Sequence, residues 1–153
     1  MVLSEQKKAL IEKIGIFYEK LGMQPAAGRI MGLMFVSDRP ELTFDEIREA
    51  LNISKSATST ALNLLLETGP VEYITFAGDR KRYFKLKTSN WRDSLAQRFN
   101  NIINFKSLLK EVQEARSEKA SEFNACLAEF IDFLDYLQHE LPNLLEKWEQ
   151  TRK

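Results

Sequence analysis

Four small hydrogen-bonding side chains recur at helical spacing in the middle of the chain, directly after a basic residue. They occupy positions i, i+3, i+4 and i+7 and are Ser56, Ser59, Thr60 and Asn63, with Lys55 before them. No Glu or Lys occurs between Ser56 and Leu66, although a solvated helix face usually carries both. Short polar groups can reach base edges or phosphates in a major groove. The stripe therefore favours a nucleic-acid-binding surface over an ordinary solvated face.

A basic segment follows closely in the chain. Between Gly78 and Lys87 there are five bases and one acid, namely Arg80, Lys81, Arg82, Lys85 and Lys87 against Asp79. Such a local excess of positive charge is expected where a protein contacts phosphates. The alternative is a charged strand edge that prevents sheets from aggregating. We favour phosphate contact, in particular for Arg80, Lys81 and Arg82, because the segment follows the polar stripe so closely.

The elements that must position these residues are specified between residues 42 and 88. A capping box of Thr43 and Glu46 begins a first helix, and Asn52, which can adopt a left-handed conformation, ends it. Ser54 caps the next helix, which ends at Gly69–Pro70. The runs 71–76 and 83–87 are rich in β-branched and aromatic residues, with a turn at 77–79, and predict a hairpin. This order predicts a helix-turn-helix followed by a β-wing.

Two helices are expected before this region. Ser4 caps the first, over residues 4–22, and Pro25 suits the first turn of the second. Gly28 and Gly32 stand four residues apart, which in a water-soluble chain indicates a close crossing of two helices rather than a membrane dimer motif.

The C-terminal part predicts long helices with a packing seam. Asn90 can cap the first, and a break is expected near Ser117. Apolar residues then repeat every seven positions in two alternating slots, one with Phe123, Phe130, Leu137 and Leu144, the other with Leu127, Leu134, Leu141 and Trp148. We expect a dimer seam centred on Phe123 to Leu141, the alternative being a helix that packs within its own subunit. Pro142 should kink this helix or start a new one.

The order of these elements resembles the MarR superfamily of winged-helix regulators. The segments Leu21–Gly32, Ser54–Ser59 and Gly78–Tyr83 are similar to its GbsR-like branch. The typical MarR wing carries Asp-x-Arg, whereas here Lys81 holds the position of the arginine. The resemblance implies that Asp79 braces the wing tip and leaves open whether Arg80 or Arg82 enters the minor groove.

Whole-chain properties agree with a small regulator. The 153 residues suffice for one compact core, so we expect a single unit over 1–153, with DNA binding in 24–88 and dimerisation in 4–22 and 90–151. The net charge is zero but segregated, because residues 111–150 hold ten acids and three bases. One cysteine excludes an internal disulfide framework. With no signal peptide and no membrane-spanning run expected, the cytoplasm is the default location.

Other chemistry is weakly indicated. Asp132, Asp135 and His139 could place three metal ligands on one helix face, but charged residues are expected there in any case. Cys126 has no base beside it in sequence that would activate a thiol. No nucleophile-base pattern, phosphate-binding loop or dinucleotide motif occurs. We therefore expect no enzyme, no cofactor and no metal.

The function predicted from these features is sequence-specific transcriptional regulation by a homodimer bound to operator DNA, as a ligand-responsive repressor. The alternative is a winged helix that docks on another protein without recognising a DNA sequence. GbsR-like regulators are associated with quaternary ammonium signals, so the resemblance implies a small cationic or apolar effector, which the aromatic faces of Phe17, Tyr18, Trp91 and Phe99 could attract. The simpler interpretation is that these rings fill the core.

Overall fold

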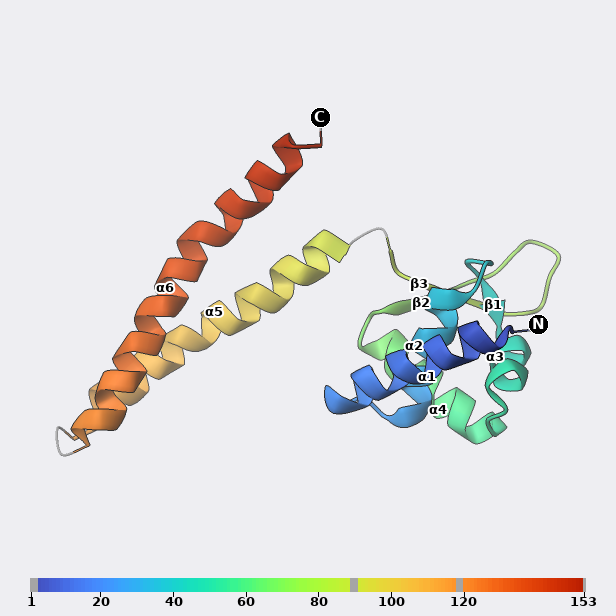
Figure 1. The fold of residues 1–153 in the computed structure, drawn as a ribbon, viewed down its shortest axis with the longest axis horizontal. Coiled ribbons are helices and arrows are strands. Elements are labelled where there is room, and N and C mark those ends of the chain that lie inside the picture. Colours follow the sequence, from blue (N-terminus) through green and yellow to red (C-terminus); the bar gives the residue numbers. More distant parts are fainter. Residues whose placement is uncertain (1–2, 89–90, 118–119, 153) are drawn as a thin grey trace. The chain divides into compact units, whose positions relative to one another are not determined.

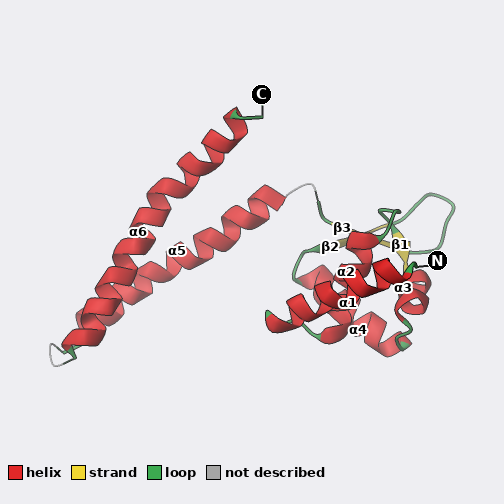
Figure 2. Ribbon diagram, viewed as in Figure 1, coloured by secondary structure: helices red, strands yellow, loops and turns green. Residues whose placement is uncertain are grey.

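The computed structural model describes residues 3–88, 91–117 and 120–152, and the chain forms two compact units, Met1–Ser89 and Asn90–Lys153. The first unit is a winged helix of four helices and three short strands (Figures 1 and 2). In chain order its elements are α1 (Glu5–Lys20), α2 (Pro25–Val36), β1 (Leu42–Thr43), α3 (Phe44–Leu51), α4 (Lys55–Glu67), β2 (Val71–Ile74) and β3 (Tyr83–Leu86). This confirms the mainly helical fold with a small β-wing.

Local sequence signals account for where these helices begin and end. The Ser4 hydroxyl accepts a hydrogen bond from the Lys7 amide, and Pro25 occupies the first turn of α2. The capping box between Thr43 and Glu46 is complete. Asn52 has φ 51° at the end of α3, which is why the chain can turn directly into α4.

The sheet is antiparallel, with the strand order β1-β3-β2. Strands β2 and β3 form the expected hairpin, whereas β1 was not predicted, because two residues carry no readable alternation. Phe84 lies opposite Leu42 and Tyr73 in this register and is buried. The core beneath the sheet is made by Ile11, Ala27, Ile30, Met31, Leu33, Met34, Leu42, Ile47, Ala61, Leu62, Leu65, Val71 and Phe84.

Helices α1 and α2 cross closely, as the paired glycines predicted. A Cβ atom on Gly32 would lie 2.9 Å from the backbone oxygen of Ile11, and one on Gly28 would lie 3.0 Å from the oxygen of Gly15. Arg29 braces the same crossing, because its guanidinium donates to the carboxylates of Glu12 and Glu19. These hydrogen bonds raise the pKa of Arg29 above its ordinary value.

The second unit is a helical hairpin of α5 (Trp91–Ala115) and α6 (Ser121–Gln150). The break near Ser117 is confirmed, and α6 continues through Pro142, so a new helix does not start there. Asn90, the expected cap of α5, lies outside the described residues. The side chains buried between the two helices are Ile103, Leu127, Ile131 and Leu134. Among the described residues, no helix is long and apolar enough to span a membrane.

The division into two compact units differs from the single core that chain length suggested. Helix α1 belongs to the first unit through its packing on α2, and α5 and α6 pack on each other. A role in dimerisation for residues 4–22 and 90–151 stays a prediction.

Candidate nucleic-acid interface

Helix α4 presents the predicted polar face to solvent. Lys55, Ser56, Ser59, Thr60 and Asn63 are all exposed. Its opposite side enters the core through Thr58, Ala61, Leu62 and Leu65, while Ala57 and Leu64 are half-buried. The four polar positions expected to face a nucleic acid therefore form one accessible surface on a helix that is held firmly from behind.

The start of α4 is fixed by Ser54. Its hydroxyl accepts a hydrogen bond from the Ala57 amide at 3.1 Å, and the Thr58 hydroxyl donates to the Ser54 carbonyl at 2.9 Å. The latter bond satisfies the one polar side chain that is fully buried among the described residues of this unit. Capping of this kind sets where Ser56 and Ser59 emerge from the surface.

A groove of about 300 Å³ joins this polar face to the wing. Its walls come from α3, α4 and β3, and its lining residues are Phe44, Ser59, Leu62, Asn63, Leu66, Arg82 and Phe84. Two of the predicted contact residues on α4 thus share one concave surface with an arginine that is distant in sequence. Periodicity placed Ser59 and Asn63 on one face, but only the fold brings Arg82 to them.

The wing loop turns at Gly78, whose φ of +85° favours glycine. The Asp79 amide donates to the Phe76 carbonyl at 3.0 Å and closes the turn. The Asp79 carboxylate accepts hydrogen bonds from the Tyr83 hydroxyl at 2.6 Å and from the Lys81 amide at 2.9 Å. These hydrogen bonds lower the pKa of Asp79, and the bond to Asp79 raises the pKa of Tyr83.

The basic residues of the wing differ in their surroundings. Arg80, Lys81 and Arg82 are exposed, and the Arg82 guanidinium lies 5.6 Å from the centroid of the Tyr73 ring. Lys85 is half-buried and lies 3.3 Å from the Glu72 carboxylate. Lys87 is also exposed, so the accessible positive charge of this segment lies at residues 80–82 and at Lys87.

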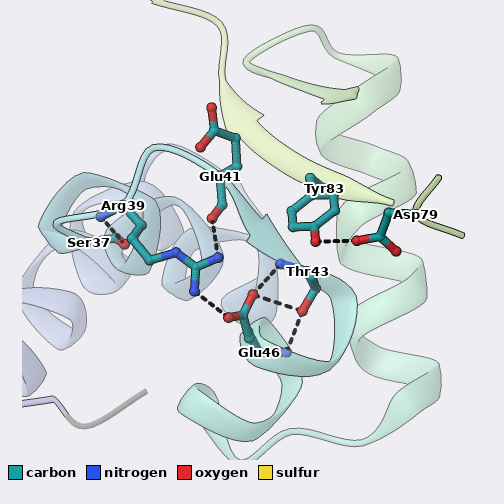
Figure 3. A network of polar contacts seen from close by, with 7 residues as sticks. All are labelled: Ser37, Arg39, Glu41, Thr43, Glu46, Asp79 and Tyr83. Atoms are coloured by element: carbon teal, nitrogen blue, oxygen red, sulfur yellow. Dashed lines mark hydrogen bonds and ion pairs between the residues drawn. The ribbon is translucent and has the colours of Figure 1, made fainter. Parts of the chain in front are cut away.

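A polar network ties the loop before α3 to the first turn of that helix (Figure 3). The Glu46 carboxylate accepts from the Thr43 amide at 2.8 Å and from the Arg39 guanidinium at 2.5 Å. The bond from the Thr43 amide is the main cause of a Glu46 pKa lowered to about 2. Arg39 also donates to the Glu41 carbonyl at 3.3 Å, so the loop before α3 is tied to the helix start.

Sequence reasoning missed two members of these networks. Arg39 was assigned no role from the sequence, and Tyr83 was expected only to begin a strand. A signal existed for Tyr83, because a tyrosine four residues after a turn aspartate can reach back to it across a hairpin. No local pattern signals Arg39, since its partner Glu46 is specified by the fold of the intervening loop.

The residues of the predicted dimer seam fall into three groups by burial within the chain itself. Leu127 and Leu134 are buried against α5, Leu137 and Leu141 are half-buried, and Phe123 and Phe130 are exposed. The apolar surface left for a partner therefore lies mainly in the heptad slot that contains Phe123 and Phe130.

The four aromatic residues proposed for an effector lie in different units. In the first unit, Phe17 is exposed and Tyr18 half-buried, with ring centroids 5.6 Å apart. Phe99 is half-buried on α5, and the side chain of Trp91 lies outside the described residues. The effector site stays a prediction.

The residues considered for a metal have other contacts. The Asp135 carboxylate pairs with Lys106 and Lys110, which lowers its pKa, and His139 Nδ1 contacts the Asp135 backbone oxygen. Within the described residues, no group of three or more His, Cys, Asp or Glu side chains is arranged to hold a metal ion. Cys126 is exposed.

Comparison with known proteins places this geometry in a family. A model of the MarR family matches residues 21–82, and a model of MmpR5-like MarR family transcriptional regulators matches residues 89–151. The chain is a MarR-family winged-helix transcriptional regulator. The two matches adjoin at the boundary between the two compact units, so the winged helix and the helical hairpin are both family features.

Relatives of this MarR-family chain cover most of its length. The transcriptional regulator MmpR5 of Mycobacterium tuberculosis is 25% identical over 140 residues, which is 92% of this chain and 85% of the relative. The transcriptional repressor OpcR of Bacillus subtilis is 22% identical over 156 residues, covering 89% and 82%. A crystal structure of a transcriptional regulator shares the fold with a TM-score of 0.72 at 24% identity, covering 95% of this chain and 99% of that one. These relatives are named as regulators rather than enzymes.

Proposed function

We propose that this regulator binds double-stranded operator DNA as a homodimer and represses transcription by occluding a promoter. The observation that carries the proposal is the groove in which Ser59 and Asn63 of α4 meet Arg82 of the wing. A winged helix needs a helix that reaches base edges and a basic ribbon that reaches the neighbouring backbone. Here both surfaces are exposed and adjoin one another.

The two surfaces have different roles in this proposal. Ser59 and Asn63 contact base edges and supply specificity, with Lys55, Ser56 and Thr60 beside them on α4. Arg80, Lys81 and Arg82 contact phosphates. Arg82 is directed to the Tyr73 ring and the groove, whereas Arg80 follows the turn aspartate in the exposed wing loop, so of the two arginines we assign to Arg80 entry into the minor groove, where it lies between the phosphates of the two strands.

The exposed aromatic residues on α6 support the homodimer. Phe123 is 53% exposed and Phe130 is 44% exposed, and Phe133 and Tyr136 add to the uncovered apolar area of the same helix. Several large apolar side chains exposed on one helix are typical of an interaction site. A second copy of the chain is the occupant that a two-fold operator requires, because each winged helix contacts one half-site.

We also propose that repression responds to a small ligand and that the chain belongs to the GbsR-like branch. One relative, OpcR, is named as a repressor. A small cationic effector would contact aromatic faces, for which Phe17, Tyr18, Trp91 and Phe99 are the proposed residues. Calorimetry with choline-like compounds tests this part alone, because it needs no DNA.

The test of DNA binding compares substitutions on the two surfaces. Asn63→Ala and Ser59→Ala should weaken binding to the DNA upstream of the protein's own gene by about 1–3 kcal/mol and leave binding to random duplex nearly unchanged. Arg82→Ala should weaken both and reduce the salt dependence. Gel shifts at two salt concentrations provide the measurement, with Asn143→Ala as the matched control, because Asn143 is an exposed asparagine of the other unit. If the wild type binds no DNA, the proposal fails and the alternative, a winged helix that docks on another protein, is favoured.

A further inference from the structure

Tyr83 is held from several sides at the base of the wing loop. It is the first residue of β3, the central strand, and its backbone lies opposite Thr43 in β1 and Ile74 in β2. Its ring packs edge-on against Phe76, with the centroids 4.9 Å apart. The hydroxyl group of Tyr83 therefore has a well-determined position.

The hydroxyl reaches into the loop that carries Arg80, Lys81 and Arg82, three exposed basic residues of the wing. It donates to Oδ2 of Asp79 at 2.6 Å, while Oδ1 of the same carboxylate accepts from the Lys81 amide at 2.9 Å. One carboxylate therefore links the strand to the loop backbone between Arg80 and Arg82. Hydrogen bonds to an ionised carboxylate are roughly twice as strong as neutral ones, so this link is effective even at the surface.

The same tyrosine lies beside the start of the helix-turn-helix (Figure 3). Thr43, its partner in β1, is the N-cap of α3 and shares the capping box with Glu46. The wing loop, the central strand and the N-terminus of α3 are thus connected through adjoining residues. Displacement of Asp79 away from Tyr83 would break the bond that links the wing loop to these elements.

We propose that Tyr83 is the wing-positioning residue, and that its hydroxyl acts through Asp79 to hold residues 80–82 ready for phosphate contact. The inference rests on the proposed DNA binding. Three adjacent like charges on a loop repel one another, and ordering such a loop at the moment of binding costs affinity. A clamp formed in the free protein removes that cost before DNA arrives.

The first test needs no DNA, because the loop itself contains three trypsin sites, after Arg80, Lys81 and Arg82. Tyr83→Phe removes only the hydroxyl and keeps the ring against Phe76. Limited trypsin cleavage within the loop should become several-fold faster, while the melting temperature changes by less than about 4 °C. Tyr73→Phe is the matched control, since Tyr73 is an exposed tyrosine on the neighbouring strand whose hydroxyl makes no hydrogen bond within the described residues.

The second test measures affinity for a short duplex of random sequence as a function of salt. Tyr83→Phe should weaken binding about 3–10-fold, the equivalent of one hydrogen bond, and make the salt dependence shallower. A role in folding alone would not change the salt dependence of the folded protein. Tyr73→Phe should bind as the wild type does.

A double-mutant cycle decides whether Tyr83 acts through Asp79. The charge lost in Asp79→Ala is common to that variant and to the double variant, so it cancels. Under the proposal, adding Tyr83→Phe to Asp79→Ala has no further effect on cleavage or affinity. Additive effects, or unchanged cleavage and affinity in Tyr83→Phe, overturn it. A wild type that binds no duplex overturns the proposed function and the DNA part of this inference, whereas the cleavage rates still decide whether the clamp orders the loop.

Discussion

The winged-helix unit and the helical hairpin differ in how much of their apolar surface each covers by itself. In the first unit one cluster of buried residues connects α1, α2, α3, α4 and all three strands. In the hairpin only Ile103, Leu127, Ile131 and Leu134 are buried among the described residues, while Phe105, Phe123, Phe130, Phe133 and Tyr136 are exposed. The first unit can fold around its own core, whereas the second leaves the kind of surface that a partner covers.

Polar contacts do not compensate for this difference. The hairpin is linked by ion pairs of Asp135 with Lys106 and Lys110 and of Arg92 with Glu149. Most of these groups are substantially exposed, and exposed ion pairs contribute little free energy. The stability of the hairpin therefore depends on few apolar side chains, each of which matters more than its counterpart in the larger core.

The largest effect is expected at Leu134, which is 1% exposed between α5 and α6. Leu134→Glu places an unpaired charge in the small core of the hairpin and should destabilise it by about 3–5 kcal/mol. Hydrogen exchange resolved by segment should show lost protection throughout residues 90–153. Protection of the winged-helix unit should persist, because its core contains no residue of the hairpin.

Phe130→Glu is the matched variant, since it introduces the same charge on the same helix at an exposed position. The hairpin should stay folded, and sedimentation should show a weaker dimer. Equal loss of protection in both variants would contradict the distinction between a buried and an exposed slot of the seam. An unchanged dimer in Phe130→Glu would place the interface elsewhere.

A smaller effect is expected at the crossing of α1 and α2. Gly32→Ala brings a Cβ atom to 2.9 Å from the Ile11 oxygen and 3.0 Å from its Cα, and these backbone atoms can move only with the whole helix. The cost should be about 1–3 kcal/mol, measured by denaturant unfolding, with exchange changes confined to the first unit. Phe35→Ala on the same helix is the control, because Phe35 is 55% exposed and its loss leaves no cavity. A neutral Gly32→Ala would show that this unit is packed more loosely than its glycines indicate.

The two units also differ in how well the sequence predicted them. In the winged helix, caps and turn residues act locally, so Thr43, Asn52, Ser54 and Gly78 could be assigned their roles directly. The polar face of α4 was equally predictable, because residues at helical spacing lie on the same side of a helix. The partners of that face were not, since the approach of Arg82 to Asn63 depends on the sheet register.

In the hairpin, a heptad pattern predicts two apolar slots on α6 but does not show which slot packs on α5 and which stays exposed. Leu127 and Phe130 belong to the same predicted seam, yet the first is buried against α5 and the second is exposed. The distinction depends on the rotation of α6 about its axis, which is set by packing on α5. The sequence therefore predicted the length and break of these helices better than the use of their faces.

The smallest expected effect tests the capping box beside the wing. The Glu46 pKa is about 2, below its ordinary value of 4.5, so its contribution to folding is fully present above pH 4.5 and is lost as the pH falls through about 2. Glu46→Gln keeps an acceptor for the Thr43 amide but loses the charge that faces Arg39, and should cost about 1–2 kcal/mol at neutral pH.

The pH dependence of unfolding separates this charge from the other carboxylates of the chain. The difference in unfolding free energy between wild type and Glu46→Gln should shrink steadily from pH 4.5 toward pH 2, because both proteins share every other acidic group. Glu41→Gln is the control, since Glu41 takes part in the network through its backbone carbonyl alone. A difference that stayed constant with pH would mean that Glu46 acts through shape rather than charge. The link between the loop before α3 and the helix-turn-helix would then not depend on Arg39.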